Sequence, residues 1–310
     1  MTFIDLGVLL AVGALWGASF LFMREAAPVL GPVGMTEARV LLAGLCLLAV
    51  TAALRRISDL RRDPGGFLVL GALTAAVPFT LIAVAELRIT ASLAAILNAT
   101  TPLFALLVSS IRQRARPSGG QFTGVLLGVV GVAVLVGLGP PHVDGTLLLA
   151  VGASLLAALC YALGGTYTQI RFPGTHPLVT ATGQQLGAAV ILLGPALALP
   201  PRRSPGTGIL LAVLALALAC TALGFVLFFR MVSRVGPTGA LSVTFLVPLF
   251  GLLWGTVFLG EPLSWSTPFG MALVLAAVFL VTDRRPPAPA RPQDGHVQEH
   301  RAAPSRRHRA

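Results

Sequence analysis

The sequence contains no lysine, and only 11 of its 310 residues are acidic. Charged residues make up 11% of the chain, whereas soluble globular proteins carry about 25%. Hydrophobic residues make up 55%, and the mean hydropathy is +0.87. So few charges cannot cover a soluble surface with polar groups. This composition excludes an ordinary cytoplasmic enzyme and a disordered protein, and it indicates a polytopic helical membrane protein.

Cysteine is also scarce, which limits the chemistry of the chain. Cys46, Cys160 and Cys220 lie far apart, each inside an apolar run. This spacing fits neither a metal site nor a disulfide framework. The chain also lacks the Gly-x-x-x-x-Gly-Lys loop that binds nucleotide phosphates. We therefore expect no metal and no cofactor.

The basic residues are all arginine, and they give the chain a net charge of +11. Seven of the 22 arginines follow Thr282, and most of the others fall in short gaps between apolar runs. This distribution is typical of loops that follow the positive-inside rule. We therefore expect a lipid bilayer, not a nucleic acid, around this protein.

Apolar runs long enough to cross a bilayer, about 20 residues each, occur ten times. Backbone groups in lipid must be hydrogen-bonded internally, and these runs are too long for barrel strands, so we expect helices. The fold class is therefore an all-α integral membrane protein with ten transmembrane helices. The predicted helices are 4–23, 32–54, 66–86, 90–111, 121–139, 145–169, 177–199, 208–231, 237–259 and 264–282.

The arginines also predict the orientation. With the N-terminus in the cytoplasm, the inner gaps hold ten arginines and the outer gaps hold four. The positive-inside rule then places both termini in the cytoplasm, as an even number of helices allows. The segment 283–310 is rich in proline and arginine, and we expect a disordered cytoplasmic tail there.

The chain repeats itself at a shift of 146 residues. Pro102-Leu103-Phe104 then falls on Pro248-Leu249-Phe250, and Arg88 falls on Arg234. At a shift of 145, Arg39 falls on Gln184. This pattern predicts two five-helix halves, 1–139 and 145–282. Because five is odd, the second half enters the membrane from the opposite side, and such inverted repeats are typical of alternating-access transporters.

Several motifs in this order resemble the drug/metabolite transporter superfamily with two EamA-type repeats. They include Trp16-Gly17-Ala18-Ser19-Phe20, the pair Pro32 and Arg39, Val235-Gly236-Pro237, and Phe258-Leu259-Gly260-Glu261-Pro262. The resemblance covers nearly the whole chain except the tail. It departs at Ala115, where the first half lacks an acid equivalent to Glu261.

The resemblance implies a secondary transporter of small molecules in the cytoplasmic membrane, with a central cavity between the halves. Family substrates include amino acids, sugars, nucleotide conjugates and toxic compounds, and we expect an exporter of amino acids, related metabolites or toxic compounds. The fifth and tenth helices of the family are peripheral and can form a homodimer contact. Gly124, Gly128 and Gly131 form a small-residue face on the fifth helix, which we expect to pack within the chain, with a dimer contact as the alternative.

Two prolines at matched positions point to the binding site. Pro102 frees the carbonyl of Asn98, and Pro248 frees that of Thr244, so we expect helix kinks there. Of the adjacent glutamines in the seventh helix, we expect one to face the cavity and the other to bond across helices. The predicted cavity residues are Trp16, Ser19, Phe20, Asn98, Thr101, Tyr161, Gln184, Gln185, Phe225 and Thr244.

Charged side chains inside a bilayer are costly and suggest function. We expect Glu37, Arg39, Glu86 and Arg88 to form a charge network that acts as an outer gate. The alternative for Arg39 is direct binding of a substrate carboxylate or phosphate. Glu37 and Glu86 are also candidate proton carriers.

Three other classes of function remain as alternatives to a transporter. A membrane-embedded enzyme needs a nucleophile–base pair or a metal cluster, and the predicted spans contain neither a histidine pair nor an aspartate dyad. The others are a non-transporting scaffold or sensor, and a channel. Saturable flux with counterflow separates a carrier from all three.

Overall fold

The computed structural model describes residues 2–138, 144–201, 203–240 and 242–282. The predicted tail 283–310 therefore lies outside the described residues. Every regular element of the described ranges is a helix, as predicted. The α-helices and the two π-helices η1 and η2 are, in order, α1 Phe3–Leu30, α2 Pro32–Ala53, α3 Ile57–Leu60, α4 Pro64–Gly71, η1 Ala72–Ala76, α5 Val77–Ala85, α6 Ala91–Asn98, α7 Thr101–Gln113, α8 Gly119–Leu138, α9 Gly145–Arg171, α10 Pro177–Ala198, α11 Thr207–Leu214, η2 Ala215–Leu223, α12 Gly224–Ala240, α13 Val243–Leu259 and α14 Ser266–Thr282.

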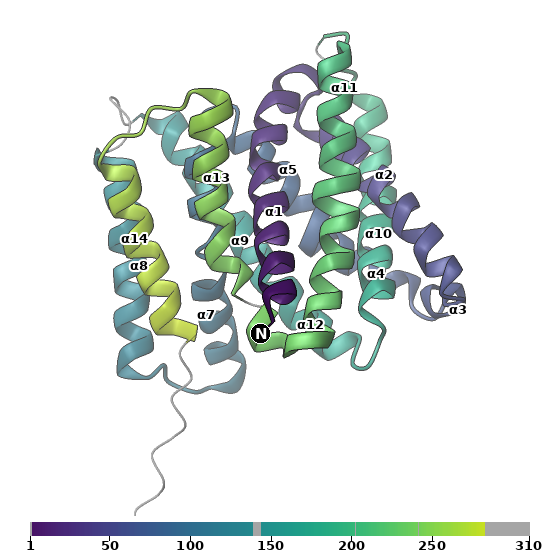
Figure 1. Cartoon of the computed structure of the whole chain (residues 1–310), viewed down its shortest axis with the longest axis horizontal. Coiled ribbons are helices and arrows are strands. Elements are labelled where there is room, and N and C mark those ends of the chain that lie inside the picture. The colour runs from purple at the N-terminus through teal and green to yellow at the C-terminus, as the bar shows by residue number, and fades with distance from the viewer. Residues whose placement is uncertain (1, 139–143, 202, 241, 283–310) are drawn as a thin grey trace, which may run out of the picture.

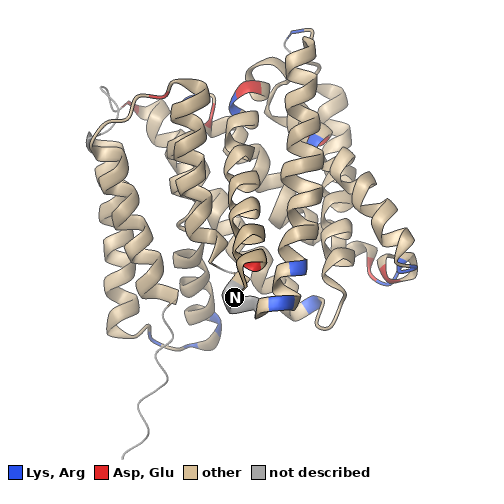
Figure 2. Ribbon diagram, in the orientation of Figure 1, with Lys and Arg blue, Asp and Glu red and all other residues tan. Residues whose placement is uncertain are grey.

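Eight of the apolar helical stretches in the described ranges are long enough to cross a membrane. Two further apolar helices, α13 and α14, have 17 residues each. Figure 2 shows that charged residues gather at the two ends of the bundle and are almost absent from its middle. Large apolar side chains such as Phe122 and Val129 on α8 point outward and are more than half exposed. An apolar belt between two charged rims is the surface that a bilayer covers.

Local signals in the sequence explain where many helices begin. Asp63, Thr90 and Asp144 cap the first turns of α4, α6 and α9 through side-chain oxygens that accept backbone N–H groups. Proline occupies the first position of α2, α4 and α10, where its missing N–H costs nothing.

The helices form one bundle with two flanks (Figure 1). The helices α8 and α14 pack side by side at one flank, and α2, α4 and α10 pack together at the other. Between them, α1 packs closely on α13, where Gly17 leaves no room for a side chain beside Phe250 and Gly251. Gly124 and Gly131 of α8 lie equally close to α14, so this glycine face packs within the chain.

The fourth and ninth predicted helices differ from their expected forms. The fourth is broken at residues 99–100 into α6 and α7, directly before Pro102. The ninth predicted helix begins at Val243 and not at residue 237. The residues before it, up to Ala240, belong to α12, which contains a non-helical Gly236 with φ +80°. The helix α13 then continues through Pro248. The two prolines therefore differ in position, because Pro102 lies in the first turn of α7 and Pro248 lies inside α13.

Candidate functional site

A cavity of about 360 Å³ lies in the middle of the bundle. Its walls come from α1, α2, η1, α5, α6, α7, α9, α10, η2, α12 and α13, so both predicted halves contribute. All of the predicted cavity residues line it except Gln185, and Pro102 and Pro248 line it too. The sequence did not point to several other lining residues, which are Met23, Thr74, Phe79, Ile82, Thr168, Cys220 and Thr221.

Arg39 lies in the wall of this cavity, where direct binding of a substrate group, the alternative to the gate, would place it. Its side chain is 5% exposed. Its Nε donates to the Thr221 hydroxyl at 3.0 Å, and its Nη1 donates to the sulfur of Met23 at 3.2 Å. The guanidinium carbon lies 3.6 Å from the centroid of the Phe79 ring, a cation–π contact. Among the described residues, Arg39 is the one charged side chain that lines the cavity.

The other members of the predicted charge network lie elsewhere. Among the described residues, none of Glu37, Arg39, Glu86 and Arg88 forms an ion pair with another. The carboxylates of Glu37 and Glu86 are buried without a hydrogen-bond partner among those residues. Arg88 is exposed in the loop after α5. The sequence places these four residues near the predicted outer ends of their helices, but it does not say which way each side chain points around its helix.

The two adjacent glutamines of α10 have different surroundings. Gln184 lines the cavity, and its Oε1 accepts from the Thr74 hydroxyl at 3.2 Å. Gln185 is completely buried, and its amide atoms have no hydrogen-bond partner among the described residues. The prediction that Gln185 bonds across helices is therefore not met. Neighbouring residues on a helix point about 100° apart, so only one of the two can face the cavity.

Two π-helical segments flank the cavity. The segment η1 spans Ala72–Ala76 and η2 spans Ala215–Leu223. A shift of 146 residues moves the first onto 218–222, inside the second. Each segment supplies a threonine to a contact with the opposite half, Thr74 to Gln184 and Thr221 to Arg39. Because π-helical turns are rare and frequent at functional sites, their matched placement is informative.

The break before Pro102 presents polar groups to the cavity. The Thr101 hydroxyl donates to the carbonyl of Asn98 at 2.8 Å and so satisfies the acceptor that the proline leaves free. The Asn98 Oδ1 is buried and has no partner among the described residues. Asn98 therefore offers an amide in the cavity wall that a bound molecule can satisfy.

Aromatic rings form much of the remaining wall. Trp16 packs against Phe225 with ring centroids 6.0 Å apart, and Phe79 packs against Tyr161 at 6.3 Å. Such rings provide apolar contact area in ligand sites, while a few polar groups orient the ligand. The cavity thus combines one cation, several neutral polar groups and an aromatic surface.

A second, wider pocket of about 820 Å³ lies where α1 ends. Arg24, Glu25, Arg88 and Glu261 line it. The left-handed Gly260, at φ +63°, ends α13 and directs the chain toward α6. The Glu261 carboxylate then accepts from the Ala91 N–H at 2.6 Å and the Ser92 N–H at 3.0 Å. An acidic group at a helix N-terminus binds unpaired N–H groups, so Glu261 joins the second half to the first.

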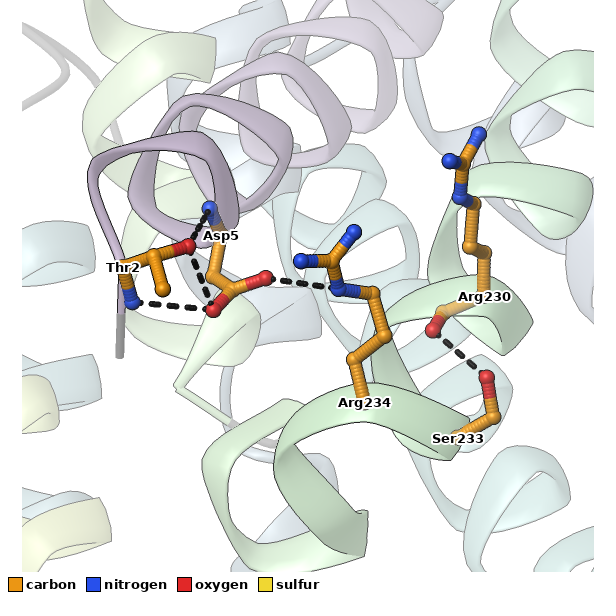
Figure 3. A network of polar contacts seen from close by, with 5 residues as sticks. All are labelled: Thr2, Asp5, Arg230, Ser233 and Arg234. Atoms are coloured by element: carbon orange, nitrogen blue, oxygen red, sulfur yellow. Dashed lines mark hydrogen bonds and ion pairs between the residues drawn. The ribbon is translucent and has the colours of Figure 1, made fainter.

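At the opposite end, a polar cluster links the start of α1 to α12 (Figure 3). The Asp5 side chain accepts from the Thr2 backbone and hydroxyl, and it pairs with Arg234 Nε at 3.0 Å. In the repeat, Arg234 corresponds to Arg88. Hydrogen bonds from the Leu147 N–H and the Thr146 hydroxyl lower the pKa of the Asp144 carboxyl, and Arg88 adds an electrostatic contribution. Each of the two arginines therefore interacts with an acidic residue near the start of another helix, and the Asp5–Arg234 pair is in direct contact.

The described residues include no group of three or more histidine, cysteine or acidic side chains that could hold a metal ion.

Known proteins resemble this chain in sequence and in fold. The chain is 27% identical over 296 residues to the "Uncharacterized inner membrane transporter YedA" of Escherichia coli, with 92% of this chain and 93% of the relative covered. It is 23% identical to an "Uncharacterized transporter" of Archaeoglobus fulgidus, with 87% and 95% covered. A solved crystal structure at 20% identity covers 91% of this chain with a TM-score of 0.64, a likeness of fold.

A family model describes the chain twice. The EamA-like transporter family matches residues 4–137 and again residues 148–283. These two matches account for most of the chain, including the cavity and both end contacts. The chain therefore belongs to the EamA-like transporter family.

Proposed function

We propose that this chain is a secondary transporter that exports a small metabolite by alternating access. The observation that carries the proposal is the central cavity, whose walls come from both halves and whose polar groups meet across them. Rocking one half against the other around such a cavity exposes it to each side of the membrane in turn. The substrate comes from the family's range of amino acids, related metabolites and toxic compounds.

The moving parts are two inverted repeats of five transmembrane helices, at 1–139 and 145–282, which make ten helices in total. The double match of the family model and the matched π-helical segments support this division. The contacts Arg39–Thr221 and Thr74–Gln184 support it further, since each joins the second helix of one half to the third helix of the other.

The transporter lies in the cytoplasmic membrane with both termini in the cytoplasm. The arginine distribution supports this orientation, and the start of α1 and the end of α14 lie at the same end of the bundle (Figure 1). The cavity residues are substrate-binding residues, and Pro102 and Pro248 shape the helices around them. A homodimer through α8 and α14 would use their outward faces, since the glycine face of α8 is occupied within the chain.

Counterflow in proteoliposomes tests the proposal. Vesicles are loaded with pools of metabolites, and uptake of labelled members of each pool is followed. We expect saturable exchange with one pool, and accumulation of the same compound in everted membrane vesicles, as export requires. Thr101→Trp, which fills the cavity, should abolish exchange in protein that melts like the wild type. Exchange that does not saturate would indicate a channel, and the absence of exchange from every pool would contradict transport.

A further inference from the structure

The lining of the central cavity carries a positive charge and no negative charge among the described residues, and this bears on which molecules it can bind. Arg39 lines it, and no acidic residue of the described ranges does so. Within those ranges Arg39 also forms no ion pair. Glu86 interacts with Arg39 electrostatically, but the two side chains form no ion pair. A buried charge without a counter-ion in contact is unfavourable, so Arg39 favours a negatively charged partner in the cavity.

The contacts of Arg39 position its guanidinium but do not neutralise it. Thr221 and Met23 accept hydrogen bonds as neutral groups, and the thioether is a weak acceptor. Thr221 in turn donates to the Leu216 carbonyl at 2.8 Å, within the π-helical segment η2. Phe79 supports the flat face of the guanidinium. These contacts hold a planar cation in one orientation, which favours recognition of a planar oxyanion.

Apart from Arg39, the described residues that line the cavity are uncharged. They include Gln184, whose Oε1 accepts from the Thr74 hydroxyl, and Asn98, whose Oδ1 is buried and has no partner among the described residues. A free amino acid would bring an ammonium group into this cavity, where no lining carboxylate of the described residues could meet it. A single arginine also balances one negative charge, whereas a phosphate dianion requires more.

We propose that the cavity binds organic monoanions, with Arg39 binding a carboxylate, the amides of Asn98 and Gln184 binding a neutral polar group, and the aromatic wall covering an apolar body. This inference rests on the proposed transport function and narrows its substrate class. Carboxylates with a hydrogen-bonding group and an apolar or aromatic body, such as N-acylated amino acids, fit this description.

The test sorts substrates by charge. A metabolite extract is separated by ion exchange into anionic, neutral or zwitterionic, and cationic fractions, and each is loaded for counterflow with the full-length protein. We expect exchange from the anionic fraction alone. N-acetylphenylalanine should compete about tenfold or more better than its uncharged amide, since hydrogen bonds to charged groups are stronger by roughly this factor.

Variants connect this selectivity to Arg39. Arg39→Gln should weaken exchange of the anionic substrate about ten- to hundredfold and remove the preference for the acid over its amide. Arg39→Lys keeps the charge without the planar fork and should fall between the two. Arg61→Gln, which removes an exposed arginine between α3 and α4, is the matched control and should behave as wild type. Melting of each variant shows whether it is folded.

The outcomes separate this inference from the transport function. Exchange confined to the cationic or the neutral fraction would overturn the anion inference and leave transport in place. Persistence of the acid preference in Arg39→Gln would also overturn it. Absence of exchange from all fractions would overturn transport itself, and the anion inference with it. If Arg39→Gln does not fold, the charge selectivity of the wild type decides.

Discussion

Two contacts in the cavity lining are built alike but differ in charge. In one, Arg39 of α2 donates to Thr221 of η2, and in the other, Gln184 of α10 accepts from Thr74 of η1. Arg39 and Gln184 correspond in the internal repeat, and so, within one residue, do the two threonines. Each contact thus joins a predicted second helix to a π-helical segment of the other half, but one uses a cation and the other an amide. Under the proposed function, the two halves share a framework and differ in the group that they offer to the substrate.

The segments that follow α7 and α13 also differ in charge at matched positions of the repeat. Glu261 follows α13 and caps the start of α6. Its counterpart in the repeat is Ala115, which is exposed after α7 and carries no acceptor. The end of the bundle near α6 therefore has a carboxylate that holds the halves together, and the other end relies on the Asp5–Arg234 pair.

The largest difference that we expect is between removing Arg39 and removing Gln184, measured as the loss of substrate binding. Gln184→Leu removes a neutral hydrogen bond, which corresponds to roughly a two- to tenfold rise in KM. Arg39→Gln should cost more than Gln184→Leu by at least severalfold. Counterflow kinetics of both variants measures the two KM values. An equal rise in KM would show that the charge of Arg39 contributes no more to binding than the neutral Gln184 amide.

Substitutions of Thr221 and Thr74 should differ less in their effect on exchange than substitutions of Arg39 and Gln184. Thr221→Val leaves Arg39 Nε without its acceptor, whereas Thr74→Val leaves only the neutral Gln184 without a donor. A hydrogen bond to a charged group is the stronger one, so we expect Thr221→Val to lower exchange about two- to threefold more than Thr74→Val. A smaller effect of Thr221→Val would mean that Phe79 and Met23 hold Arg39 by themselves.

The Glu261 contact should affect stability more than binding. Glu261→Ala exposes the Ala91 and Ser92 N–H groups at the start of α6, and loss of a helix cap should lower the Tm by roughly 2–6 °C. Ala115→Glu places a carboxylate at the matched position, where we expect no change in Tm. Thermal unfolding in nanodiscs measures both, and a Glu261→Ala variant that melts like the wild type would refute the joining role.

The smallest effect that we expect is a pH-dependent change in Tm on loss of the Asp63–Arg171 pair. The Arg171 side chain, at 2.6 Å, and the Gly66 N–H lower the pKa of the Asp63 carboxyl. The stabilisation is present above the unfolded pKa of about 3.9 and is lost as pH falls through the folded value. Asp63→Asn should therefore lower the Tm slightly near pH 7, and the difference from wild type should shrink as pH falls below about 4 and disappear only below the folded pKa. A difference independent of pH would exclude the ionised pair as its cause.

Much of the fold and part of the site follow from local sequence. Long apolar runs and proline or capping residues at their starts predict helices because the bilayer allows few alternatives. Asn98 and Pro102 were found because proline removes a defined hydrogen bond. Gln185 was misjudged because the sequence places it beside Gln184 but does not say which of the two faces the cavity.

The sequence by itself determined the class of protein, its apolar helices, the repeat and the family, because these depend on composition and on spacing along one segment. Only the tertiary structure decided that Arg39 lies in the cavity without an acid, that η1 and η2 are π-helical, and that Glu261 caps α6. The partners Arg39 and Thr221 are 182 residues apart, and Glu261 and Ala91 are 170 apart. Which groups meet over such separations depends on how the helices rotate and pack, and no local pattern carries that information.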